Sequence, residues 1–152
     1  MAKIRGAPPS NGAGAETVVH ASAVSWKSRA ALLLGRSGSG KSRHALEMMA
    51  MGAGLVADDR TRLRRRGNFV FASAPESILG KIEARGVGIL RADYAGEAKV
   101  VVAVDLDTEE LERLPPRRSF RLLSVEIDLV LGAKMESLAA KVIQHLKRGQ
   151  AE

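Results

Sequence analysis

The sequence predicts an α/β fold in which helices flank a mixed sheet around a phosphate-binding loop. Residues 30–34, "AALLL", form the short continuous apolar run that is typical of a strand covered on both faces. The glycine-rich stretch "GRSGSGKS" at 35–42 follows directly, and the apolar residues of 43–51 then recur at helical spacing. Strand, glycine loop and helix in this order predict a P-loop-containing core.

The segments on either side of this core fit the same sheet. Residues 17–24, "TVVHASAV", have strand composition, and we expect them to lie beside the 30–34 strand. The helix after the loop should end at Gly52. Its apolar positions are Ala45, Met48, Met49 and Met51. Residues 54–59, "GLVADD", then predict a strand that ends in two acids.

The second half of the chain contains more strand than a plain doubly wound sheet would have. Residues 60–74 predict two strands joined at Gly67-Asn68, the first of them very basic. Pro75 can open a short helix that reaches Leu79, and 83–90 is interrupted by glycines. Residues 98–106 predict a buried strand, 119–131 alternate loosely, and 135–147 predict an amphipathic helix. The apolar face of that last helix consists of Leu138, Val142, Ile143 and Leu146.

Length and composition bound the domain organisation and the compartment. The 152 residues suit one domain, which we place at 17–148, with a disordered segment at 1–16 and a tail at 149–152. The absence of cysteine excludes a disulfide framework and a thiolate metal site. No apolar run approaches the ~20 residues of a membrane span, so we expect a soluble cytoplasmic protein with no membrane partner. The net charge of +7 favours polyanionic partners such as nucleotides, nucleic acid or an acidic protein.

The loop satisfies the Walker A pattern G-x-x-x-x-G-K-[ST] through Gly35, Gly40, Lys41 and Ser42. In that pattern, backbone N–H groups and a helix N-terminus surround phosphate oxygens, the lysine contacts the β and γ phosphates, and the serine binds Mg²⁺. The alternative is a glycine turn that only joins a strand to a helix. The predicted nucleotide-binding residues are Gly35, Arg36, Ser37, Gly38, Ser39, Gly40, Lys41 and Ser42.

Two acids stand where a phosphoryl-transfer enzyme needs them. A P-loop kinase requires one acid near the metal and one that takes the proton of the attacking hydroxyl. Asp58 and Asp59 end the strand that follows the loop's helix, and the carboxyl edge of an open sheet is where ligands bind. Paired acids at a strand end are also common as solvated turn residues. The prediction of a functional role therefore rests on their position after the strand that follows the loop's helix.

The combination of motifs resembles the catalytic domain of the HPr kinase/phosphorylase family. The resemblance rests on His20 in "VVHASAV", on "GRSGSGKS" with "ALE" behind it, on "LVADDR" at 55–60 and on "EARGVGIL" at 83–90. It extends from about Val18 to the final helix and implies the fold of that catalytic domain, here in a short form without a separate N-terminal domain. It also implies an HPr-type phosphocarrier as substrate and a homo-oligomer, which is a hexamer in that family.

The resemblance also implies roles for individual residues. His20 matches an active-site histidine, Lys41 the phosphate-loop lysine, and Ser42 and Glu83 two magnesium ligands. Asp59 matches the acid that accepts the serine proton in phosphorylation and returns it in the reverse reaction. The predicted set of catalytic residues is His20, Lys41, Asp58, Asp59, Arg85 and Lys134.

Three of these roles, those of Asp58, Arg85 and Lys134, are less direct. Asp58 would assist its neighbour, and Arg85 would hold the loop or counter phosphate charge. Lys134, in "VLGAKMES", is the only cation where the family has a basic loop with an arginine. A lysine cannot reproduce a bidentate guanidinium contact, so dephosphorylation is the less secure half of the activity. His44 and His145 have no partner motif, and we interpret both as structural or exposed.

The predicted function is therefore an ATP- and Mg²⁺-dependent serine kinase for an HPr-type protein of the bacterial phosphotransferase system. Use of pyrophosphate, the reverse reaction and base specificity stay open. The alternatives are a P-loop kinase for a small molecule and a non-catalytic nucleotide-sensing module. Nucleic acid is the least favoured partner, because the run "RLRRR" at 62–66 lacks interleaved aromatic residues apart from Phe69 and Phe71 across the turn.

Overall fold

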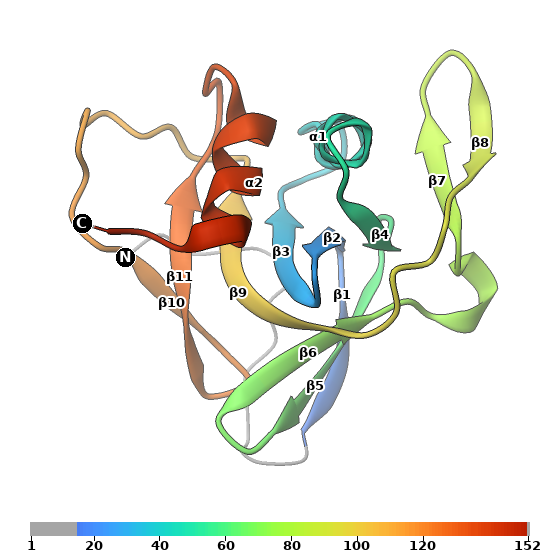
Figure 1. The fold of residues 1–152 in the computed structure, drawn as a ribbon, viewed down its shortest axis with the longest axis horizontal. Coiled ribbons are helices and arrows are strands. Elements are labelled where there is room, and N and C mark those ends of the chain that lie inside the picture. Colours follow the sequence, from blue (N-terminus) through green and yellow to red (C-terminus); the bar gives the residue numbers. More distant parts are fainter. Residues whose placement is uncertain (1–14, 152) are drawn as a thin grey trace.

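A curled, mixed sheet carries two helices on one face (Figure 1). The structure is a computed structural model, and it describes residues 15–151. The elements follow in chain order as β1 (Glu16–Val19), β2 (Ala21–Trp26), β3 (Arg29–Leu34), α1 (Lys41–Ala50), β4 (Gly54–Ala57), β5 (Thr61–Arg66), β6 (Phe69–Ser73), the 3-10 helix η1 (Glu76–Ile78), β7 (Lys81–Ala84), β8 (Gly88–Arg91), β9 (Ala98–Asp105), β10 (Ser119–Leu122), β11 (Val125–Leu131) and α2 (Leu138–Arg148).

Three parallel strands form the centre of the sheet. The strand order is β1-β5-β6-β9-β3-β2-β4, and β11 joins β9 along the edge that β6 leaves free, with β10 beside it. β3 and β11 both run parallel to β9, so that Leu34 and Leu131 each pair with Asp105. The carboxyl ends of these strands therefore meet at one edge of the sheet, where the glycine loop leaves β3.

The apolar pattern of β3 explains why the sheet has a core on each face. Leu32 and Leu34 belong to the cluster enclosed by the curl of the sheet, and Leu33 belongs to the cluster beneath the helices. All three are buried, as predicted for a strand covered on both sides. The predicted pairing of this strand with the preceding one is confirmed by the antiparallel β2–β3 ladder.

Both helices pack an apolar face on the sheet. The predicted face of α2 is confirmed, because its four apolar residues are buried together with Ala139. α2 begins at Leu138, later than predicted, because Ser137 adopts a left-handed φ of 55°. In α1, Ala45 and Met48 are buried, whereas Met51 caps the helix and is 47% exposed.

Two segments differ from the predicted elements. The predicted strand 17–24 is two strands that separate at His20, because β1 pairs with β5 while β2 pairs with β3 and β4. The glycine-interrupted segment 83–90 forms most of a hairpin, β7–β8, which pairs only within itself and projects beside α1 (Figure 1). The predicted disordered segment lies almost entirely outside the described residues.

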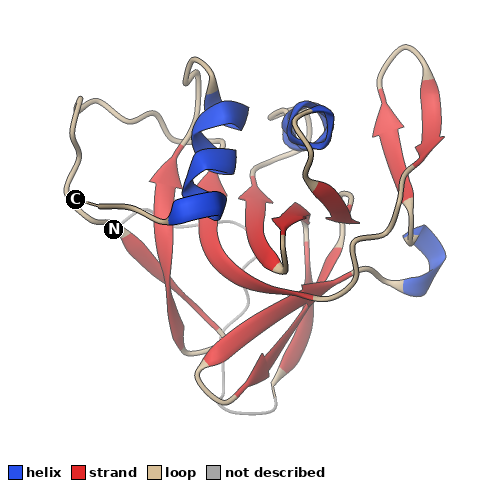
Figure 2. Cartoon of the chain, in the orientation of Figure 1, coloured by secondary structure: helices blue, strands red, loops and turns tan. Residues whose placement is uncertain are grey.

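Helix coverage of the sheet is uneven. α1 and α2 lie over the half of the sheet that contains β2, β3 and β9, while β5 and β6 extend away from both helices (Figure 2). No helix within residues 15–151 combines the length and apolarity that a bilayer crossing requires.

Candidate functional site

The glycine loop closes around its own lysine. Gly38 and Gly40 have φ values of 84° and 100°, a region that favours glycine, and Gly40 is the N-cap of α1. Lys41 is 5% exposed, and its ammonium group donates hydrogen bonds to the carbonyl oxygens of Gly35 at 2.7 Å and Arg36 at 3.1 Å. The loop therefore holds one buried positive charge beside the N-terminus of α1, where anions bind favourably.

Tight packing at the start of the loop fixes its path. A Cβ atom at Gly35 would lie 2.4 Å from Oγ of Ser39 and 3.2 Å from Cβ of Leu106. The carboxylate of Asp107, just after β9, accepts hydrogen bonds from the backbone N–H of Arg36 at 3.1 and 3.3 Å. Sequence reasoning missed Asp107. The available signal was an acid just after a buried strand, since neighbouring parallel strands end at the same edge of the sheet.

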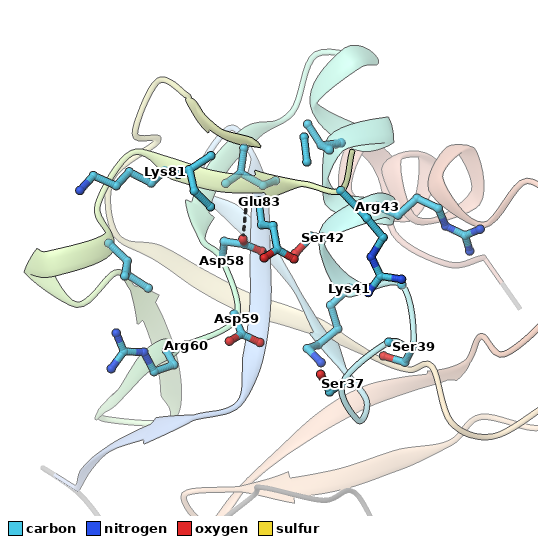
Figure 3. Close-up of a pocket in the computed structure, with 18 of the residues that line it drawn as sticks. Ser37, Ser39, Lys41, Ser42, Arg43, Asp58, Asp59, Arg60, Lys81 and Glu83 are labelled. Atoms are coloured by element: carbon cyan, nitrogen blue, oxygen red, sulfur yellow. Dashed lines mark hydrogen bonds between the residues drawn. The ribbon is translucent and has the colours of Figure 1, made fainter. Parts of the chain in front are cut away.

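The first acid of the β4–β5 turn is a buried acceptor for three elements. Oδ1 of Asp58 accepts hydrogen bonds from Oγ of Ser22 at 2.9 Å and from Oγ of Ser42 at 2.6 Å. Its Oδ2 accepts from the backbone N–H of Glu83 at 2.9 Å (Figure 3). Asp58 is 8% exposed, and it ties β2, the start of α1 and β7 to one point.

The second acid faces outward beside the predicted histidine. Oδ1 of Asp59 lies 2.6 Å from Nε2 of His20, and the two side chains are 60% and 52% exposed. Asp59 has a φ of 66°, a left-handed conformation that is uncommon outside glycine and that turns its side chain away from that of Asp58. Its backbone N–H donates to Oγ of Ser22 at 3.0 Å. The two neighbouring carboxylates therefore have different environments, because that of Asp58 is buried and hydrogen-bonded at both oxygens, whereas that of Asp59 is accessible.

Ser22 is a site residue that the motifs did not reveal. It is fully buried, and its single hydroxyl donates to Asp58 while accepting from Asp59. The available signal was its position two residues after His20, which was already a candidate site residue. In an extended chain, side chains two residues apart point to the same side.

An open cleft of about 1080 Å³ joins these groups. The loop and the start of α1 form one wall, the β7–β8 hairpin forms the other, and the two acids lie between them (Figure 3). Arg60, Lys81 and Arg85 also line the cleft, and Val87 and Ile89 of the hairpin line it while remaining 76% and 64% exposed. The cleft is cationic at its rim and carries exposed apolar side chains on one side.

The oxygen atoms gathered in the cleft are of the type that Mg²⁺ prefers. The Ser42 hydroxyl and the carboxylates of Asp58 and Glu83 approach one another on one side of the cleft, with Lys41 on the other (Figure 3). Residues 15–151 contain no group of three histidine or acidic side chains that could hold a metal by themselves. The set suits Mg²⁺, which keeps most of its water and binds one or two protein ligands together with substrate phosphates.

The cleft brings together some of the predicted residues and leaves others outside. Lys41, Ser42, Asp58, Asp59, Glu83 and Arg85 line it, and His20 reaches it through Asp59. Lys134 is in the turn after β11 and is not among the lining residues. His44 and His145 are also outside, and burial lowers the pKa of each, as suits structural residues.

Comparison with known proteins places the chain in a family. Residues 13–114 match the HPr Serine kinase C-terminal domain. The HPr kinase/phosphorylase of Alkaliphilus metalliredigens is 34% identical over 116 residues, which are 73% of this chain and 38% of that protein. That of Chlorobium luteolum is 36% identical over 125 residues, with the same coverage of 73% and 38%. That of Caldanaerobacter subterraneus subsp. tengcongensis is 45% identical over 76 residues, 49% of this chain and 25% of that protein.

The chain thus spans between about a quarter and two fifths of these relatives, 25% to 38% of their length. Among solved structures, the Hpr(Ser) kinase/phosphatase from Coxiella burnetii superposes with a TM-score of 0.71 at 21% identity, over 87% of this chain and 88% of that one. This similarity confirms the predicted fold. With two thirds of its residues matched by the family model, the chain belongs to the HPr Serine kinase C-terminal domain family.

Proposed function

We propose that this chain is an ATP- and Mg²⁺-dependent serine kinase that phosphorylates an HPr-type phosphocarrier protein of the bacterial phosphotransferase system. Family membership supports the substrate class. The observation that carries the proposal is the arrangement of Asp58 and Asp59, one hydrogen-bonded to the phosphate-loop serine and the other to His20, in a single cleft. A nucleotide-binding loop and a candidate base for an incoming hydroxyl are thereby adjacent.

The loop would bind the nucleotide phosphates. Backbone N–H groups at the start of α1 and the ammonium group of Lys41 would contact phosphate oxygens, which would replace the loop carbonyls that Lys41 now contacts. Ser42 and Glu83 would supply oxygen ligands to Mg²⁺, which neutralises phosphate charge. Asp58 supports this arrangement, because it orients the Ser42 hydroxyl and the backbone of Glu83.

Asp59 would act as the general base. Nε2 of His20 donates to Oδ1, which leaves Oδ2 for the hydroxyl of the acceptor serine. As that oxygen attacks the γ-phosphorus in line, its proton passes to Asp59 and ADP leaves. General bases typically contribute about 10²–10⁴-fold to rate, and positioning and charge neutralisation supply the rest.

A protein acceptor suits the cleft better than an enclosed small molecule. The cleft is open, and its hairpin wall presents Val87 and Ile89 to solvent beside Arg85. Exposed apolar side chains flanked by cations suit contact with an acidic protein surface. We propose phosphorylation as the principal reaction, because Lys134, which stands where the resemblance implies an arginine, does not line the cleft and cannot make a bidentate contact.

The test is transfer of labelled γ-phosphate from ATP with Mg²⁺ to a purified HPr-type protein. The matched control is the same acceptor with its target serine replaced by alanine. Labelling that requires the serine supports the proposal. Confirmed ATP binding without labelling of the acceptor would contradict it and favour a small-molecule acceptor or a nucleotide sensor.

A further inference from the structure

A basic and aromatic surface lies outside the cleft, on the part of the sheet that neither α1 nor α2 covers. We call it the basic face and define it as Arg62, Arg64, Arg66, Phe69, Phe71 and Lys99. These residues come from β5, β6 and the start of β9. The β5–β6 hairpin extends away from α1 and the β7–β8 hairpin (Figure 1). None of the six residues lines the catalytic cleft.

The register of the strands interleaves the cations with the rings. Arg66 pairs with Phe69 and Arg64 pairs with Phe71, so each ring shares a face of the sheet with an arginine. On its other side Phe71 pairs with Lys99 of β9. The run of arginines lacks aromatic neighbours along the chain, but the antiparallel pairing places them directly across from it.

Contacts on this face are electrostatic. The guanidinium carbon of Arg66 lies 4.0 Å from the centroid of the Phe71 ring, and Nζ of Lys99 lies 4.5 Å from that of Phe69. Phe69 is 52% exposed. Cations over ring faces indicate a surface that can both stack and neutralise charge.

Two carboxylates already show how the arginines bind anions. Glu97 accepts from Arg64 at 3.3 Å and Arg66 at 2.6 Å, and Glu16 lies 3.5 Å from Arg62. The arginine side chains are 42% to 52% exposed, so these pairs are weakly held and a polyanion can compete for them. Four cations against two acids leave the face with net positive charge.

We propose that the basic face binds single-stranded nucleic acid. Arginines along β5 would follow the phosphates while unpaired bases stack on Phe69 and Phe71, the combination by which sheet surfaces bind single strands. An acidic protein would use the cations but would leave charge-flanked rings without a role. A membrane surface would need a larger apolar area than these two rings offer. The proposal is independent of the kinase activity.

Fluorescence anisotropy with the full chain and a labelled oligo(dT) of about 15 nucleotides tests it. We expect the logarithm of the association constant to fall linearly with the logarithm of the salt concentration. The slope should be about −2 to −3, as expected for four phosphate contacts on a single strand. We also expect duplex DNA of equal length, polyglutamate and anionic phosphatidylserine vesicles to compete poorly. Equal competition by polyglutamate or vesicles would overturn the proposal in favour of an acidic protein or a membrane.

Single substitutions separate stacking from charge. Phe69→Ala leaves the charge unchanged and should weaken binding roughly 5- to 100-fold, while Phe69→Tyr should bind normally. Leu114→Ala, at another exposed apolar residue, is the matched control and should have no effect. Arg64→Gln should weaken binding and reduce the slope by about 0.7, whereas the exposed Arg113→Gln should change neither. Binding that survives Phe69→Ala, or no binding at low salt, overturns the proposal, provided that melting curves show the variants folded.

Discussion

The phosphate loop and the β4–β5 acid turn form the same cleft, but they are held in different ways. The loop is shaped mainly from within, because Lys41 donates to the carbonyl oxygens of Gly35 and Arg36, six and five residues away, and the distant Asp107 holds only the N–H of Arg36. The acid turn is shaped from outside. Asp58 accepts from groups 36, 16 and 25 residues away along the chain, and His20, 39 residues away, holds Asp59.

This difference has a functional consequence. A loop whose lysine binds its own carbonyl oxygens depends less on distant parts of the chain, whereas the acid turn depends on the packing of β2, α1 and β7 around it. Substitutions in the loop should therefore alter nucleotide binding first, and substitutions around the turn should alter transfer first. The variants of Asp59, Gly35 and Ser22 below test this separation.

Asp59→Asn should give the largest effect on transfer with little effect on binding. Asparagine tolerates the left-handed φ of 66° but cannot accept the serine proton. We expect phosphoryl transfer to fall about 10²–10⁴-fold, the usual contribution of a general base. Nucleotide affinity, measured by calorimetry, should change less than twofold. Near-normal transfer by this variant would exclude Asp59 as the base.

Gly35→Ala should give the opposite pattern, with nucleotide affinity falling first. The new Cβ would meet Oγ of Ser39 at 2.4 Å, so the loop must shift. Overpacking of this kind costs about 1–3 kcal/mol, which corresponds to a loss in affinity of roughly 5- to 140-fold if binding must restore the loop's shape. The double variant Gly35→Ala/Ser39→Gly removes the clashing side chain and should recover most of the affinity. A Gly35→Ala protein with unchanged affinity would mean that the loop shape is not what binds the nucleotide.

Ser22→Ala tests whether the acid turn is held from outside. The change leaves the Asp59 N–H without its acceptor and removes one donor from Asp58, at a cost of about 1–3 kcal/mol. We expect transfer to fall about tenfold or more, with an altered pH profile of kcat/KM and nearly unchanged nucleotide affinity. Ser22→Thr keeps the hydroxyl and should retain activity. Ser25→Ala, also buried in β2, is the control, and an equal loss there would reduce Ser22 to a packing role.

The same contrast explains how much of the molecule the sequence predicts. The loop, its strand and its helix follow from local pattern, since apolar runs and glycine spacing are short-range signals. Asp58 and Asp59 are predicted by position. Ser22 depends on the antiparallel register that sets Ala23 opposite Ala57 and thus brings Ser22 beside Asp58, a pairing that no motif encodes. Asp107 likewise depends on the parallel pairing of β9 with β3.

The basic face shows a signal that the sequence analysis noted, in Phe69 and Phe71 across the turn, but to which it gave too little weight. The predicted turn at Gly67-Asn68 already implies that Arg66 pairs with Phe69 and Arg64 with Phe71, as the structure has them. Reading the arginine run along the chain alone hides this interleaving. The division of the predicted first strand at His20 was harder to predict from the sequence, because it results from β1 and β2 pairing with different neighbours.

The smallest expected effect is on the pH dependence of protein stability. It helps to distinguish a loss of folded protein in acid from a loss of phosphoryl transfer in the tests above. Burial lowers the pKa of His145, an effect that Arg29 and Arg117 add to and Asp128 opposes, and neither ring nitrogen has a hydrogen-bond partner among the described residues. Above pH ~6.5 the histidine is neutral in both the folded and the unfolded chain, so it contributes no pH dependence there. Below that, the unfolded chain takes up the proton first, and the free energy of unfolding should fall until the folded state is protonated too.

His145→Leu should therefore flatten the fall in melting temperature between pH 7 and 5, and Gln144→Leu, at the exposed neighbour, should not. If His145→Leu leaves the fall in melting temperature unchanged, other groups cause the loss of stability in acid. The acidic residues of the β4–β5 turn would then be candidates, and the pH profile of transfer would include a contribution from unfolding.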